Sequence, residues 1–82
     1  MKTFSQLRAT FLEILAQLKH LEGTGTITRA MYTMQEREAG KLCYQVEEDL
    51  SQEELSLFKE KLQLKESTWN AYKKACIEGL HP

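Results

Sequence analysis

The chain has 82 residues, of which 41% are hydrophobic and 28% are charged, and its formal net charge is -1 at pH 7. A chain of this length predicts a single domain, residues 1–82, that buries roughly 60–65% of its unfolded surface. The composition is typical of a folded soluble protein and argues against disorder. A net charge near zero gives no electrostatic reason to expect nucleic acid or an anionic membrane as a partner.

Cys43 and Cys76 are the two cysteines, too few for a disulfide framework. Both have apolar neighbours, which favours buried free thiols; a disulfide or a reactive thiol is the alternative. Arg8 and Glu13 interrupt any apolar stretch near the start, so we expect no signal peptide. No apolar run approaches the roughly 18 residues of a membrane span. We therefore expect a cytoplasmic protein that makes no membrane contact.

Residues 3–21 carry the clearest helical pattern, because apolar residues recur there at spacings of three and four: Phe4, Leu7, Phe11, Ile14, Leu18 and Leu21. This spacing places one apolar stripe along an α-helix, and Leu12 and Leu15 widen it. Thr3 and Gln6 have capping-box spacing at its start, and Gly23 suits its end.

The apolar stripe has to be buried against another surface, and the sequence allows two: the rest of this chain or a second copy of it. If residues 27–49 also form a helix, the first helix is a core helix. If they do not, five residues of the stripe become the candidate interface with a second copy: Phe4, Leu7, Phe11, Ile14 and Leu18.

Residues 23–26, with the sequence GTGT, predict a loop after the first helix. They lack the P-loop pattern and follow a helix, so a nucleotide site is not expected there. Residues 27–49 favour a helix, since they are rich in helix formers, with Ile27, Met31 and Met34 on one stripe. Two alternatives stay open: two shorter helices parted near Gly40, or a β-hairpin at about 27–47 that gives the order α-β-β-α-α.

A third helix follows Ser51, which stands three residues before Glu54 in a capping box, with Leu50 and Leu55 placed as a hydrophobic staple. Its core face is Leu55, Phe58 and Leu62, while Leu57 lies off this face and is expected to meet a second neighbour. An acidic cluster surrounds its start: Glu47, Glu48, Asp49, Glu53 and Glu54. Negative charge suits a helix N-terminus, and an acidic docking surface for a basic partner is the functional alternative.

A fourth helix is expected to begin near Ser67 or Thr68 and to stop at Gly79. Its inward side repeats as Trp69, Tyr72, Cys76 and Leu80, and the Trp69 indole N–H should find a partner at the rim of the core. The fold class is thus all-α, a compact bundle of three to five helices.

Residues 62–75, LQLKESTWNAYKKA, resemble the second half of a helix-turn-helix of the phage-repressor type. The resemblance implies DNA binding through five residues: Lys65, Ser67, Thr68, Asn70 and Lys73. Gln63 stands where that motif usually has a turn glycine, and Lys59 where it usually has a small residue. Two packed antiparallel helices joined by a short turn are the alternative interpretation.

No pattern of catalytic or metal-binding residues accompanies these helices. The chain holds two histidines, His20 and His81, and one aspartate, and it lacks CxxC, HExxH, GxSxG and EF-hand sequences. His20 is expected to be a solvated residue at a helix end. We therefore predict a non-enzymatic interaction or regulatory protein without a cofactor or metal, self-associating through the first helix. The alternative is a helix-turn-helix regulator that binds DNA.

Overall fold

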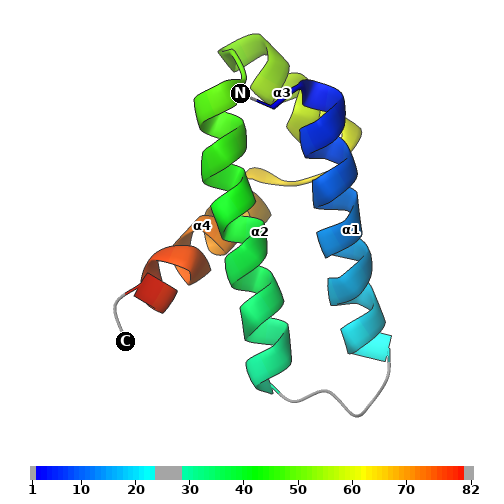
Figure 1. Ribbon diagram of the computed structural model, residues 1–82, viewed down its shortest axis with the longest axis vertical. Helices are drawn as coiled ribbons and strands as arrows, with labels where there is room; N and C mark the ends of the chain where they lie inside the picture. Colours follow the sequence, from blue (N-terminus) through cyan, green and yellow to red (C-terminus); the bar gives the residue numbers. More distant parts are fainter. Residues whose placement is uncertain (1, 24–28, 81–82) are drawn as a thin grey trace.

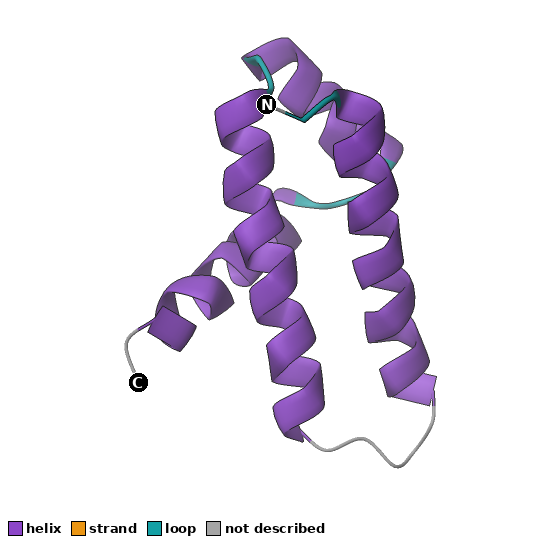
Figure 2. Cartoon of the chain, in the orientation of Figure 1, coloured by secondary structure: helices purple, strands orange, loops and turns teal. Residues whose placement is uncertain are grey.

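The structure, a computed structural model, describes residues 2–23 and 29–80. It contains α1 (Phe4–Gly23), α2 (Arg29–Asp49), α3 (Gln52–Lys61) and α4 (Glu66–Leu80), with no strand in the described ranges. The predicted all-α bundle is confirmed. The two long helices, α1 and α2, run antiparallel and side by side, and α3 crosses the end of the molecule where α1 begins (Figures 1 and 2). The last helix, α4, crosses behind α2, and its C-terminal end points away from α1 (Figure 1).

Residues 29–49 form one continuous helix, α2, so the two alternative predictions for this segment, a β-hairpin and a pair of shorter helices, are both wrong. Strong helix formers dominate the segment, and α2 packs against both α1 and α4. Five residues of α2 are buried: Ala39, Gly40, Leu42, Cys43 and Val46. Gly23, the first residue of the predicted GTGT loop, is the last residue of α1. The rest of that loop and the first two residues of the predicted second helix lie outside the described residues.

Gly40 lies where α2 and α4 cross, which explains a glycine in the middle of a helix. A Cβ atom on Gly40 would lie 2.6 Å from the Cβ of Cys76 and would collide with the carbonyl oxygen of Tyr72. A residue with a side chain would therefore push α4 away from α2. The sequence marks Gly40 as a possible helix break because glycine is unfavourable inside a helix. Its role in packing cannot be recognised in the same way, because it depends on α4, which starts 26 residues later.

Local hydrogen bonds set the starts of α1 and α3 as predicted. The Thr3 Oγ1 accepts from the Gln6 N–H at 3.2 Å, and the Gln6 side chain accepts from the Thr3 N–H at 3.0 Å. Ser51 and Glu54 form the second capping box, before α3. After α3, Gln63 takes a left-handed conformation with φ of 56°.

This end of α3 has the hydrogen bonds of a Schellman motif, which satisfy otherwise unpaired carbonyls. The Gln63 N–H donates to Glu60 and the Leu64 N–H donates to Lys59. Leu64 is then partly buried against the core, so the turn to α4 has a defined course.

The core is built around aromatic rings from α1, α3 and α4. Phe11 stacks on Trp69, with ring centroids 5.7 Å apart, and meets Phe58 edge-on at 5.8 Å. Phe4 adds a further edge contact to Phe58 at 5.4 Å. Phe11, Phe58 and Trp69 are fully buried, so the predicted inward residues of three helices meet in one cluster.

The boundaries of α4 differ slightly from the prediction. The helix begins at Glu66, one residue before the expected start, and continues through Gly79 to Leu80. Gly79 therefore does not stop the helix. Leu80, the last of the predicted inward residues, has a side chain that lies outside the described ones.

Candidate functional site

The apolar stripe of α1 faces the interior of the chain itself. Leu7 and Phe11 are completely buried and Leu18 is 4% exposed, while Phe4 and Ile14 are partly buried against the same core. Because residues 29–49 form a helix, α1 is a core helix, which is the first of the two alternatives that the sequence allowed. Leu7, Phe11 and Leu18 therefore offer no free surface to a second copy, whereas Phe4 and Ile14 keep part of their side chains exposed. Leu12 is the more exposed large apolar residue of α1, at 44%.

The residues that the helix-turn-helix resemblance assigns to DNA do not all share one free face. Lys65, Ser67 and Asn70 are exposed, and Thr68 is half-buried. Lys73 lies beside α2, where its ammonium group is 2.9 Å from the Glu47 carboxylate and 5.0 Å from the centre of the Tyr44 ring. The one lysine of this set on the body of α4 is thus held by an interaction within the chain.

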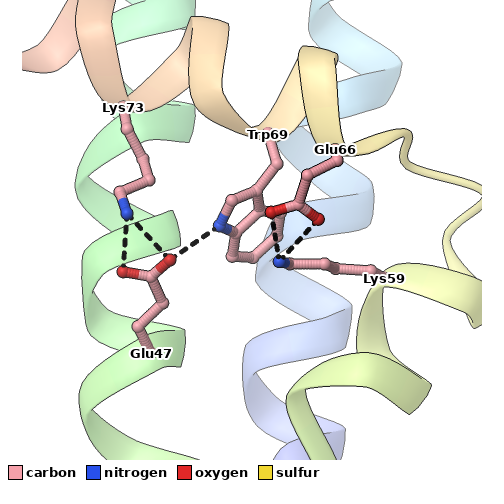
Figure 3. A network of polar contacts seen from close by, with 5 residues as sticks. All are labelled: Glu47, Lys59, Glu66, Trp69 and Lys73. Atoms are coloured by element: carbon pink, nitrogen blue, oxygen red, sulfur yellow. Dashed lines mark hydrogen bonds and ion pairs between the residues drawn. The ribbon is translucent and has the colours of Figure 1, made fainter. Parts of the chain in front are cut away.

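The most developed polar cluster joins α2, α3 and α4 around Trp69 (Figure 3). The indole N–H of Trp69 donates to Glu47 at 2.9 Å, which is the partner that the sequence analysis expects. Lys73 donates to the same carboxylate, and the Lys59 ammonium lies 4.9 Å from the Trp69 ring centre. Lys59 also forms an ion pair with Glu66 at 3.0 Å. Every charge in this cluster has an opposite charge or a ring beside it, so the cluster fastens α4 to α2 and α3.

The electrostatics of Glu47 follow from this geometry. Partial burial raises the pKa of its carboxyl group, but the hydrogen bonds from Trp69 and Lys73 outweigh that effect and hold the pKa below its usual value of 4.5. The same hydrogen bond to Glu47 raises the pKa of Lys73. Both groups stay charged at neutral pH, which suits a structural ion pair better than proton transfer.

Internal contacts also account for other members of the predicted acidic cluster. Asp49 accepts from the Lys2 N–H at 3.1 Å and from Gln45 at 2.7 Å. Glu54 belongs to the capping box of α3, while Glu48 and Glu53 are exposed. If the acidic cluster is a docking surface for a basic partner, Glu48 and Glu53 are its members without a contact described above.

Both cysteines are buried and free, as expected. Burial raises the pKa of the Cys43 thiol to about 12, so this thiol is protonated and unreactive at neutral pH. Cys76, 6% exposed, faces Gly40 across the crossing of α2 and α4. Among the described residues, no group of three or more His, Cys, Asp or Glu side chains could hold a metal ion.

Among the residues that the structure describes, six large apolar side chains are more than a third exposed: Leu12, Met31, Met34, Tyr44, Leu57 and Ile77. Met34 is the most exposed of them, at 62%. It lies on α2 six residues before Gly40, the residue at the crossing with α4. Leu57, the residue expected to meet a second neighbour, is 45% exposed within this chain.

An open groove of about 250 Å³ lies between α2 and α4, next to the crossing. Met34 and Cys76 give it an apolar lining, and Arg37 and Lys41 lie at i and i+4 on the same wall. Gly79 forms part of the opposite wall, and a Cβ there would lie 2.6 Å from the Arg37 Nε, so the Arg37 side chain lies directly against α4.

Arg37 is the cation of the groove without a carboxylate partner among the described residues, whereas Lys41 contacts Glu38 at 3.4 Å. Sequence reasoning missed this groove because it placed Met34 on an apolar stripe of the second helix without showing which neighbour that stripe would meet. The sequence signal for the groove is the i, i+4 spacing of Arg37 and Lys41. That spacing indicates a groove wall only once α4 is known to lie beside these residues.

No protein family, no curated protein and no solved structure matches this chain. In the described part of the chain, no helix is both long enough and apolar enough to cross a membrane.

Proposed function

We propose that the protein is a small non-catalytic interaction protein that associates with a second copy of itself. The observation that supports the proposal is the contrast between a closed core and a partly apolar surface. Phe11, Phe58 and Trp69 are fully buried within one chain, yet Met34 and Leu57 remain 62% and 45% exposed. Exposed apolar side chains are candidates for burial at a protein contact, and Met34 lines the groove between α2 and α4.

The proposed contact differs from the one expected for α1. The α1 stripe is used internally, so association has to involve the outer residues of the bundle. Two buried free thiols fit a reducing compartment, which favours the cytoplasm as the place of action.

Light scattering coupled to size exclusion tests this proposal on the full chain. At high micromolar concentration we expect a mass of about twice the 9.5 kDa of one chain, falling toward one chain on dilution. A mass that stays at one chain over this whole range contradicts the proposal.

DNA binding is the second candidate, and the turn between α3 and α4 is the observation that favours it. Gln63 adopts a left-handed conformation at the position where the helix-turn-helix motif usually has glycine. Lys65 and Asn70 are exposed on the C-terminal side of that turn. Retention of duplex DNA that weakens steeply with salt, and with Lys65→Glu, supports this candidate. Absence of retention at low salt excludes it.

A further inference from the structure

We propose that α3 of one copy docks into the groove between α2 and α4 of another copy, with Leu57 entering beside Met34. The proposal rests on the self-association put forward above and names the two surfaces that meet. Leu57 lies on the solvent side of α3, and Met34 lines the groove. The groove is lined by residues of α2 and α4, whereas Leu57 lies on α3, so the two surfaces share no residue and one copy can use both at once.

Shape favours this pairing because the groove has room for one apolar side chain. Its volume is about 250 Å³, and a cavity of about 150 Å³ already accepts a group the size of benzene. Met34 and Cys76 supply the apolar lining. A methionine at the rim adapts to an incoming side chain, since it has an unbranched and flexible thioether.

Charge favours the same pairing. Helical spacing places Glu53 and Glu60 on one flank of Leu57, at i−4 and i+3, and both are exposed. The groove is lined by two cations, Arg37 and Lys41, and by one carboxylate, Glu38, which pairs with Lys41. Arg37 has no carboxylate partner among the described residues, so the lining of the groove keeps a net positive charge. An acidic helix with an apolar centre thus faces a basic groove with an apolar floor, which is the complementarity that sets specificity and orientation in protein contacts.

Single substitutions test the two surfaces separately. Leu57→Asp places a charge in the groove and should weaken association at least about tenfold, as expected for an anchor at an interface centre. Glu60→Lys is the second variant on α3; it sits near the C-terminal end of the helix, where a positive charge does not oppose folding. Arg37→Glu should weaken association from the groove side.

Each variant has a matched control. Leu12→Asp changes a leucine that is 44% exposed on α1, against 45% for Leu57, and should leave association unchanged. Arg8→Glu, also on the exposed side of α1, is the control for Arg37→Glu. Thermal unfolding, monitored by circular dichroism, tests whether each variant is folded before its mass is measured.

Mixing provides the decisive measurement. The Leu57→Asp chain keeps an intact groove, and the Arg37→Glu chain keeps an intact α3. Each alone should be a monomer at a concentration where the wild type associates, and the equimolar mixture should form a 1:1 complex of about twice the 9.5 kDa chain mass.

The outcomes separate this inference from the proposed function. If the wild type associates but both variants associate equally well, the α3-to-groove contact is wrong while self-association stands. If the two variants fail to combine on mixing, the surfaces are not complementary and the inference is overturned. If the wild type is a monomer throughout, both ideas fail together.

Discussion

Replacing Gly40 with alanine tests the packing on which the whole bundle depends. Alanine is the better helix former by about 1 kcal/mol, so local preference alone predicts a more stable protein. The added methyl group would collide with the Tyr72 carbonyl oxygen and lie 2.6 Å from the Cys76 Cβ. The first of these atoms belongs to the α4 backbone, so relief requires movement of a helix. Overpacking of a core typically costs about 1–3 kcal/mol, and a contact with backbone should lie at the upper end of that range.

The net expectation for Gly40→Ala is therefore a loss of about 1–2 kcal/mol, or a fall in Tm of roughly 5–15 °C for a domain of this size. Urea and thermal unfolding of the full chain measure it. A peptide of residues 29–49 provides the control for local preference, because the same substitution should raise its helicity. A Gly40→Ala chain as stable as the wild type would refute the close crossing of α2 and α4.

Three further predictions concern the turn, the charge cluster and the core. Gln63→Gly should raise stability by roughly 0.5 kcal/mol, because glycine accepts the left-handed conformation, whereas Gln63→Ala should bring no gain; urea unfolding compares the two. Glu47→Gln should cost about 1 kcal/mol at pH 7, since Lys73 loses its charged partner at a partly exposed site. The folded pKa of Glu47 is depressed, so this contribution is present above pH 4.5 and is lost as the pH falls through the folded pKa; unfolding at pH 3 should show a smaller difference from the wild type. Phe11→Ala should cost about 3–5 kcal/mol because the ring is fully buried, and a smaller loss in equilibrium unfolding would contradict its central place in the core.

Features decided within a few residues were predictable from the sequence. The capping boxes at Thr3 and Ser51 depend on side chains three positions apart, and both are present. The inward residues Phe11, Phe58 and Trp69 follow from helical spacing, which does not need a known partner. Prediction succeeded where the physical cause lies inside one helix.

Features decided between helices were not predictable in this way. Gly40 reads as a weak point in a helix until α4 is placed against it. Met34 reads as a core residue, but α4 crosses α2 nearer its middle and leaves Met34 62% exposed. Lys73 reads as a DNA contact, whereas Glu47, 26 residues away, binds it. In each case the deciding atom belongs to another helix whose crossing angle the sequence does not specify.

Gly79 links the packing of the helices to the proposed contact, and it permits a test in which stability and association separate. A Cβ at Gly79 would meet the Arg37 side chain, 2.6 Å from its Nε and 2.7 Å from its Cδ, rather than any backbone atom. A flexible side chain can move aside, and Gly79 is next to the last residue of α4, where the helix preference of alanine counts for less than in the middle of a helix. Gly79→Ala should therefore change the free energy of unfolding by no more than about 0.5 kcal/mol.

The displaced guanidinium would no longer lie along the groove wall that receives α3. We therefore expect Gly79→Ala to weaken self-association several-fold by light scattering while Tm stays within a few degrees of the wild type. Gly40→Ala should instead act mainly on stability, because it displaces α4 and so lowers Tm. If Gly79→Ala associates as the wild type does, the position of Arg37 plays no part in the contact, and the charge argument for the groove fails even if Leu57 proves essential.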